Sequence, residues 1–373
     1  MKKSILLTLI AFILSVSLAL AGNPYIKPLK VEAQGPRFSF AVFGDTRTSE
    51  LGTPDGHDVV FQLARDQVFK AVSQTVTDGG AAFSLFTGDL IWQGGVTEYW
   101  ESPARAFSSQ VRARIYPIPG NHETWKDADL DHYFEFFPHL KNNHSYYFTQ
   151  GNSLFLSLCT GGYLGEYSEA ASFKQDQEVT CIKAGYTDWD LPGFLNERSQ
   201  EMAAAGTPLK NIFVQYHKPS FSHYKHPPLN RENDPVEALK AFRGQAPQVQ
   251  MYVFNGHNHT TELYQPARGI TVLVAGGGGA PQKVLSQDLP SKKVMKIYKK
   301  KGVKEIFWTS LGTTTEDRTQ RVNYWMVEVD HTLNRVRLEE KVLTYDASGP
   351  VFVKGLAVEN GRVMVEEQRV ALP

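Results

Sequence analysis

Short apolar runs recur along the chain from Pro36 onward, and each of them ends in a glycine or a polar loop. Their lengths and their content of Val, Ile and Phe are typical of buried β-strands. With the loop residues that close them, the runs cover residues 38–45, 81–89, 113–122, 210–217, 248–257 and 269–279. We predict one strand in each of these segments.

Longer segments with a helical pattern separate several of these runs. Residues 59–76 carry apolar side chains at a spacing of three and four, which predicts an amphipathic helix. A second helix is predicted at residues 188–205. Because strands that alternate with helices are typical of α/β domains, we expect an α/β fold.

The C-terminal part of the chain turns to β-type patterns. Residues 324–330 and 334–346 predict a hairpin, and residues 351–370 hold an Asn-Gly turn between two alternating runs. We expect the hairpin to complete a second sheet, and the place of the last strands stays open. The segment from the glycine run to about Ser310 indicates an irregular or partly helical insertion.

The composition is that of an ordinary globular protein. The chain has 373 residues, of which 42% are hydrophobic and 21% are charged, so it can bury a large core without disulfides or metals. The 39 basic and 39 acidic residues balance, which provides no electrostatic argument for a nucleic-acid partner. One basic stretch, residues 292–304, is interpreted as a solvated face without a partner.

The N-terminus has the pattern of a secretory signal peptide at residues 1–21. Lys2 and Lys3 precede an apolar run, and Ala19-Leu20-Ala21 is a small-residue cleavage site. We expect a secreted or periplasmic protein without a membrane segment after cleavage, and an uncleaved anchor is the alternative. In an exported chain the two cysteines, Cys159 and Cys181, could pair, but their spacing leaves the pairing open.

The loops that close the predicted strands carry Asp, Asn and His, whose oxygen and nitrogen atoms suit divalent metals. In open α/β sheets, ligands bind at the carboxyl edge of the strands. Any one of these residues could be an ordinary turn former, but together they suggest a metal site. In chain order the loops contain Gly44-Asp45-Thr46-Arg47, Gly88-Asp89, Gly120-Asn121-His122-Glu123, His217 and Gly256-His257-Asn258-His259.

This series of loops resembles the calcineurin-like metallophosphoesterases over residues 36–285. Residues 142–158 and the AGGGGAP stretch at residues 275–281 resemble extracellular members of the purple acid phosphatase type. The resemblance implies a four-layer αββα sandwich with extra C-terminal β-strands. With the hairpin counted in the second sheet, we place the catalytic domain at residues 36–345 and a C-terminal β extension at residues 346–373.

The resemblance also implies a role for each loop residue. One or two divalent or trivalent ions (Mn, Zn or Fe, not distinguishable from these ligands) would be held by six residues. Asp89 would bridge both ions, Asp45 and His259 would bind the first, and Asn121, His217 and His257 would bind the second. Hydrolysis would proceed by attack of a metal-bound hydroxide, with His122 as the general acid.

Two residues depart from the family pattern. Arg47 stands where many members have a metal-binding histidine, and Trp92 stands where purple acid phosphatases have a tyrosine. Because neither side chain can bind a cation, the first site has fewer ligands. Arg47 is either a clamp for a phosphate oxygen or only an ion-pair partner. His223 is either a substrate-binding residue or an ordinary loop residue, and Glu123 and Trp125 are expected at the mouth of the site.

The pattern therefore predicts a secreted metal-dependent phosphoesterase that acts on small-molecule phosphate esters, with monoesters slightly favoured over diesters. The alternative is a metal- or phosphate-binding protein of the same fold that has lost catalysis, which the exchanges at Arg47 and Trp92 motivate.

Overall fold

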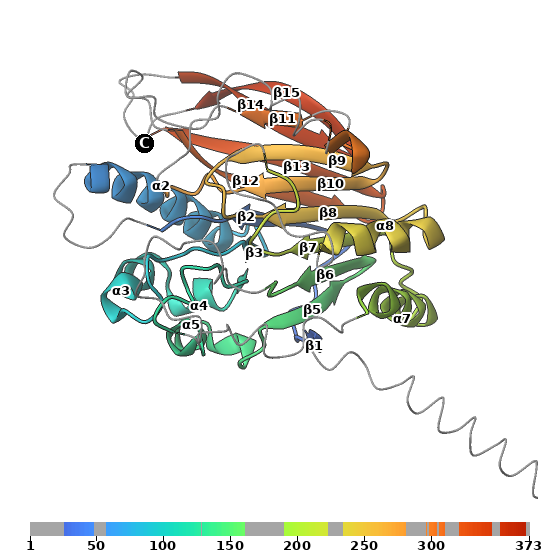
Figure 1. Ribbon diagram of the computed structural model, residues 1–373, viewed down its shortest axis with the longest axis horizontal. Helices are drawn as coiled ribbons and strands as arrows, with labels where there is room; N and C mark the ends of the chain where they lie inside the picture. Colours follow the sequence, from blue (N-terminus) through green and yellow to red (C-terminus); the bar gives the residue numbers. More distant parts are fainter. Residues whose placement is uncertain are drawn as a thin grey trace, which may run out of the picture.

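The computed structural model describes ten segments of the chain, and Figure 1 shows their arrangement. They comprise residues 26–47, 57–127, 129–160, 190–222, 234–280, 296, 298–303, 306–309, 321–344 and 351–370. The predicted signal peptide lies outside these residues. None of the helices in these segments is long and apolar enough to cross a bilayer.

The described strands form two sheets. The first has eight strands in the order β1-β5-β6-β7-β8-β10-β9-β11, and the second has seven in the order β15-β14-β13-β12-β2-β3-β4. The first sheet consists of β1 (Ile26–Pro28), β5 (Ser145–Gln150), β6 (Ser153–Ser157), β7 (Asn211–Gln215), β8 (Gln250–Asn255), β9 (Thr261–Ala267), β10 (Ile270–Ala275) and β11 (Ile306–Thr309). The second consists of β2 (Arg37–Phe43), β3 (Phe83–Phe86), β4 (Ile115–Pro117), β12 (Arg321–Asp330), β13 (Arg335–Thr344), β14 (Val351–Glu359) and β15 (Arg362–Val370).

The helices fall into two groups, which Figure 1 shows apart from each other. They are α2 (His57–Thr77), α3 (Thr97–Ala106), α4 (Ser109–Arg112), α5 (Asp131–Phe136), the short 3₁₀ helix η1 (Pro138–Leu140), α7 (Leu191–Ala204) and α8 (Pro235–Gln245). Helix α2 packs on β3, β12 and β13, and α3 and α4 pack on α2. Helices α7 and α8 pack against each other and share a core with the first sheet.

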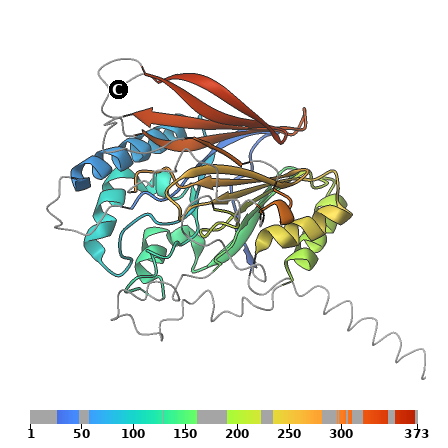
Figure 2. The same cartoon turned by 45° about the horizontal axis from the view of Figure 1, so that its top comes forward.

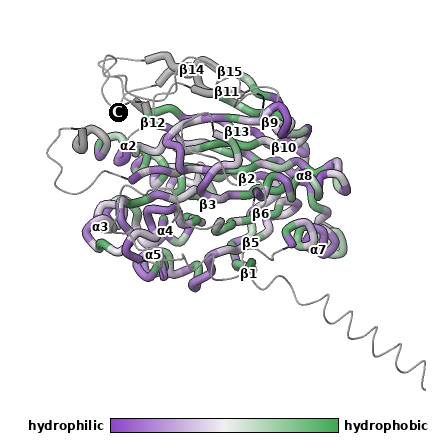
Figure 3. Tube along the Cα trace, in the orientation of Figure 1, coloured by the Kyte–Doolittle hydropathy of each residue, from purple (hydrophilic) through white to green (hydrophobic). Residues whose placement is uncertain are grey.

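Alternate side chains of the first sheet enter two different cores. On β7, Phe213 joins the core between the sheets, whereas Ile212 and Val214 join the core beneath α7 and α8. Both faces of this strand are therefore buried, which explains its continuous apolar run. Figure 3 shows hydrophobic and hydrophilic residues mixed along α7 and α8, as expected for helices with one face on a sheet.

Aromatic rings fill the space between the sheets. Phe40 on β2 stacks on Phe83 with ring centroids 5.3 Å apart, and it meets Phe155 and Phe213 of the other sheet edge-on, each at 5.2 Å. Edge-to-face pairs at such distances are favourable in addition to the area that they bury. This core fixes the two sheets face to face, and Figure 2 shows the sheets as separate layers.

The four-layer αββα arrangement confirms the predicted fold class. The pair β12–β13 forms the predicted hairpin and continues the second sheet through the antiparallel contact of β12 with β2. The last two strands, left open by the sequence, form a second hairpin that pairs with β13 at Arg337–Glu339. Sequence patterns did not predict the short elements β1, β9, β11, α3, α4, α5 and α8. Strand β11 lies in the segment that we interpreted as an irregular or partly helical insertion.

We expect Phe40→Ala to lower the free energy of unfolding by about 3–5 kcal/mol, because it leaves a cavity between the two sheets. Denaturant unfolding monitored by circular dichroism measures this loss. As a control, Leu333→Ala should change the stability by less than about 0.5 kcal/mol, because Leu333 is 62% exposed. A loss of less than about 1 kcal/mol for Phe40→Ala would contradict this account of the core.

Candidate metal centre

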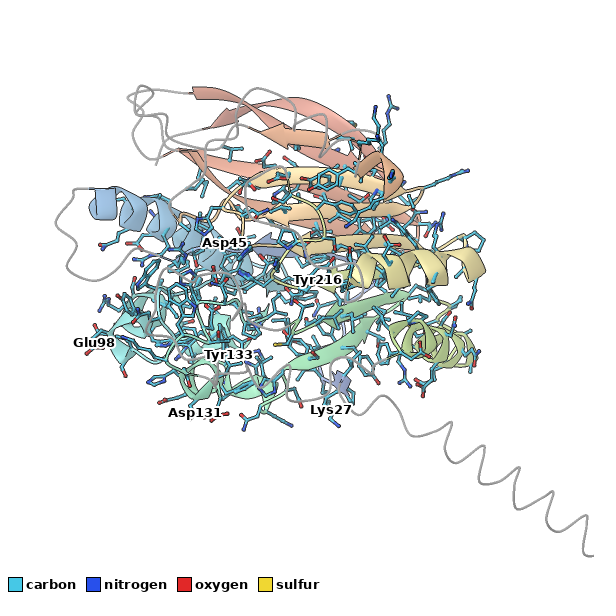
Figure 4. All side chains as sticks on the ribbon, in the orientation of Figure 1. Lys27, Asp45, Glu98, Asp131, Tyr133 and Tyr216 are labelled. Atoms are coloured by element: carbon cyan, nitrogen blue, oxygen red, sulfur yellow. The ribbon has the colours of Figure 1, made fainter. Side chains whose placement is uncertain are left out.

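The candidate ligands follow directly after parallel strands of both sheets. Asp45, which is labelled in Figure 4, follows β2. Asp89 follows β3, and His217 follows β7. Backbone hydrogen bonds join these loops: Asp45 N–H donates to Gly88 O at 2.9 Å, and the Thr46 and Arg47 N–H groups donate to Asp89 O at 2.9 and 3.0 Å. The His257 N–H, which follows β8 of the other sheet, donates to the Asp45 carboxylate. The carboxyl ends of strands from the two sheets therefore meet at one edge of the sandwich.

Four of these residues have a left-handed backbone conformation, which residues other than glycine rarely adopt. The φ angles of Asp45, Asp89, His257 and His259 are 54°, 61°, 73° and 47°. A strained backbone of this kind persists only where the surrounding structure holds it, and such residues cluster at functional sites. One restraint is visible at Asp45, whose carboxylate accepts the His257 N–H with both oxygens at 2.8 Å.

The side chains form two groups that could each hold a cation. Ligand atoms of Asp45, Asp89 and His259 lie within 4.8 Å of one another, and so do those of Asp89, His217 and His257. Asp89 belongs to both groups, as a carboxylate shared by two ions must. The structure thus brings the six predicted residues together, with Asn121 joining the second group. Their role as metal ligands stays a prediction.

The second group contains an excess of hydrogen-bond acceptors. His217 Nε2 lies 3.2 Å from Asn121 Oδ1, 3.3 Å from His257 Nδ1 and 3.3 Å from Asp89 Oδ1. The other ring nitrogen, Nδ1, donates to the Thr87 carbonyl at 2.7 Å, because a carbonyl can only accept. Nε2 then presents a lone pair to other acceptors, and a proton or a cation must lie among them. The donor set fits a metal ion, with Thr87 O fixing the ring of a ligand histidine.

The charges of the centre are poorly balanced without a cation. Burial, together with the charge of Asp89, raises the pKa of Asp45 well above its usual range. Burial also acts to raise the pKa of Asp89, but the charge and the hydrogen bond of His217, together with the charge of Arg47, hold it well below its usual range. Burial acts to lower the pKa of His217, and the neighbouring carboxylates raise it to about 9. The carboxylates compete for a limited positive charge that bound cations would supply.

Glycines allow the ligand loops to approach closely. A Cβ atom on Gly88, whose φ is 93°, would lie 2.6 Å from His217 Nδ1 and 2.7 Å from Gly120 N. A Cβ atom on Gly120 would lie 2.2 Å from Asp89 Oδ1. Side chains at either position would push the ligand loops apart.

Glu123 does not line the mouth of the site, contrary to our expectation. Its side chain is fully buried and accepts the N–H groups of Asp89, Leu90 and Gly120 at 2.9, 2.6 and 2.6 Å. Burial, followed by the charge of Asp89, raises the pKa of Glu123 to about 7. The residue instead ties the Asp89 loop to the loop that carries Asn121.

Arg47 and His122 lie beside the ligands. The Arg47 guanidinium carbon lies 4.6 Å from the centre of the Trp92 ring, and its Nε lies 3.8 Å from Asp89 Oδ2. His122 Nδ1 donates to the Trp92 carbonyl at 2.7 Å, and its Nε2 lies 3.8 Å from Asp89 Oδ2. Burial and then the charge of Arg47 lower the pKa of His122 to about 3, so its ring is neutral here. The ring of Trp125 packs on that of His122 with centroids 4.0 Å apart.

Of the remaining candidate residues, His223 and Cys181 lie outside the described part of the chain, and Cys159 lies within it. His223 lies outside the described residues, so its role stays a prediction. Cys159 is buried after β6 and takes part in a disulfide. Cys181, the other cysteine of the sequence, lies outside the described residues.

The glycine run after β10 supports the first group of ligands. Gly278 N–H donates to Gly44 O at 3.1 Å, and Ala280 N–H donates to Asp45 O at 2.8 Å. A Cβ atom on Gly278 would lie 2.2 Å from Gly44 O. The run therefore supports the backbone of the Asp45 loop at a distance that only glycine allows.

One comparison with known protein families identifies the family of the chain. The sequence model of the calcineurin-like phosphoesterase family matches residues 38–261. None of the curated proteins compared with the chain matches its sequence.

Among solved structures, the chain is similar to a 5'-nucleotidase from Candida albicans, with 12% identity and a TM-score of 0.39. The match covers 78% of this chain and 54% of the nucleotidase, so the chain spans about half the length of that protein. It is also similar to a protein serine/threonine phosphatase from Saccharomyces cerevisiae, with 10% identity, a TM-score of 0.34 and coverage of 88% and 85%.

We expect Glu123→Gln to weaken metal binding about tenfold, because mutation of a residue that holds a metal ligand in place usually lowers metal affinity by at least this factor. The amide presents a donor where three backbone N–H groups need an acceptor, so Asp89 should lose its fixed position. Calorimetric titration of the metal-free protein with Mn²⁺ measures the affinity. Glu98→Gln, at an exposed position of α3, is the matched control. Equal affinities of wild type and Glu123→Gln would show that Glu123 does not support the site.

Proposed function

The chain belongs to the calcineurin-like phosphoesterase family, and from this membership and the ligand geometry we propose that it is a secreted metal-dependent phosphomonoesterase. The observation that carries the proposal is the sharing of Asp89 between two groups of ligand atoms. Two-metal hydrolases of phosphate esters need such a shared carboxylate.

The residues of the centre would divide between two cations as the resemblance implies. Asp45 and His259 would bind one, Asn121, His217 and His257 would bind the other, and Asp89 would bind both. Bound cations would attract the phosphate oxygens and lower the pKa of a water molecule. Because the ligand set mixes oxygen and nitrogen donors, Mn, Zn and Fe all suit it.

The protein side chains beside the cations would bind the ester and assist the leaving group. Arg47, whose Nε lies 3.8 Å from Asp89 Oδ2, can clamp a phosphate oxygen with two hydrogen bonds. The negative charge of a bound ester would raise the pKa of the neutral His122. Its Nε2 could then take up a proton and pass it to the departing oxygen.

Monoesters fit this arrangement better than diesters. A monoester has three free phosphoryl oxygens, which leaves at least one for Arg47 after the cations are satisfied. A diester has only two. The resemblance to extracellular phosphatases of the purple acid type favours the same substrate class, and small-molecule esters are the partners that we propose.

We expect the purified protein to hydrolyse a chromogenic phosphomonoester faster than its diester when supplied with Mn²⁺, Zn²⁺ or iron. Asp89→Asn should abolish turnover because both ions lose a ligand. His122→Ala should lower kcat by about 10²–10⁴-fold and leave the metal content unchanged. Asp78→Asn, at an exposed position, is the matched control for the first variant.

The second candidate function is a metal- or phosphate-binding protein without catalysis. The observation in its favour is that Arg47 and Trp92 occupy positions that hold ligands in relatives, so the first group offers three side chains. It predicts tight binding of at most one ion and no turnover with any metal. Turnover that Asp89→Asn removes would exclude it.

Secretion rests on residues 1–21 alone. We expect export in a host with a general secretory pathway to yield a mature chain that begins at Gly22, because cleavage would follow the Ala19-Leu20-Ala21 pattern. N-terminal sequencing or intact-mass measurement of the exported protein tests this. A mature protein that retains Met1 would support the uncleaved anchor instead.

A further inference from the structure

One indole ring contacts both side chains that flank the ligand cluster. The guanidinium carbon of Arg47 lies 4.6 Å from the centre of the Trp92 ring. The imidazole of His122 lies 4.8 Å from Trp92, with the two rings inclined by 36°. Both neighbours are largely buried: the Arg47 side chain is 13% exposed and that of His122 is 5% exposed.

The backbone of the same residue holds His122 as well. The Trp92 carbonyl accepts the Nδ1 proton of His122 at 2.7 Å, which leaves Nε2 directed toward Asp89. Trp125 adds a second wall, since its ring centre lies 4.0 Å from that of His122 and 5.4 Å from that of Trp92. His122 is thus confined by two indole rings and one carbonyl.

We infer that Trp92 is a positioning residue that holds Arg47 and His122 in the orientations needed to bind and protonate a phosphate ester. The inference rests on the proposed function for the roles of these two groups. It assigns to Trp92 a task other than the ligand role of the tyrosine found at this position in purple acid phosphatases.

The physical reason is the flexibility of an arginine side chain. An unrestrained arginine loses rotamer freedom when it becomes fixed, and this loss of entropy opposes ligand binding. A guanidinium stacked on an indole face is already oriented before the ligand arrives. Attraction to Asp89 alone, with Nε at 3.8 Å from Oδ2, would draw Arg47 into the ligand cluster. The Trp92 face offers a second attraction that holds the guanidinium beside the cluster.

The experiment measures binding of inorganic phosphate to the metal-loaded protein by calorimetry, in a double-mutant cycle. We expect Trp92→Ala to weaken binding about tenfold, and Trp92→Phe, which keeps an aromatic face, to weaken it less. In an Arg47→Ala background, Trp92→Ala should have no further effect, because Trp92 acts through Arg47. Arg112→Ala removes a similar stacking contact, with Phe136, at 4.8 Å and is the matched control.

A second experiment measures kcat and KM for a phosphomonoester and tests the effect of Trp92 on His122. Trp92→Ala should lower kcat as well as raise KM, whereas in a His122→Ala background it should leave kcat unchanged and only raise KM. Metal content and the thermal unfolding midpoint of each variant show whether the fold and the ligand cluster persist.

Four results of the binding experiment would overturn the inference. The phosphate affinity of Trp92→Ala could equal that of the wild type, or Trp92→Phe could lose as much affinity as Trp92→Ala. The fold-losses of affinity in Arg47→Ala and Trp92→Ala could multiply in the double mutant, or the wild type could bind no phosphate. If the wild type binds phosphate but hydrolyses no ester, the proposed function fails. The binding cycle then still decides the role of Trp92.

Discussion

The carboxylate and the backbone of Asp89 are the constraint on which the rest of the site depends. Its side chain lies within reach of both groups of candidate ligands, its carbonyl accepts the N–H groups of Thr46 and Arg47, and its own N–H donates to Glu123. Asp89 also has a left-handed backbone. Asp89 is therefore a charged ligand candidate, a link between the loops and a residue with a strained backbone. A shift of its loop would displace candidate ligands in both groups.

The packing of the two sheets converts separate loops into one centre. Asp45, Asp89 and Asn121 follow strands of one sheet, whereas His217 and His257 follow strands of the other. These loops can meet only if the sheets keep a fixed distance and register, which the phenylalanine core between them imposes. Stability and function are thus coupled here, because the layer that stabilises the fold also sets the spacing of the ligands.

Burial of so many polar groups is unfavourable unless each has a partner. Buried carboxylates that cannot all be charged at once, and acceptors that face one another, form a centre that needs positive charge. Arg47 supplies one fixed charge, and the proposed cations would supply the rest. With Arg47 in the place of a metal-binding histidine, as the resemblance implies, positive charge would be divided differently between protein and metal, while the overall requirement for it would remain.

The sequence by itself determined the strands that became β2, β3, β4, β7, β8 and β10, the two C-terminal hairpins, the amphipathic helix that became α2, and the residue types at the strand ends. These features follow from local periodicity and turn chemistry, which neighbouring residues decide. Only the tertiary structure decided that Glu123 points inward and that Trp92 lies against Arg47 and His122, because these contacts join residues that are 30 or more positions apart. Side-chain direction at such positions depends on the packing of whole loops, which a local pattern does not contain.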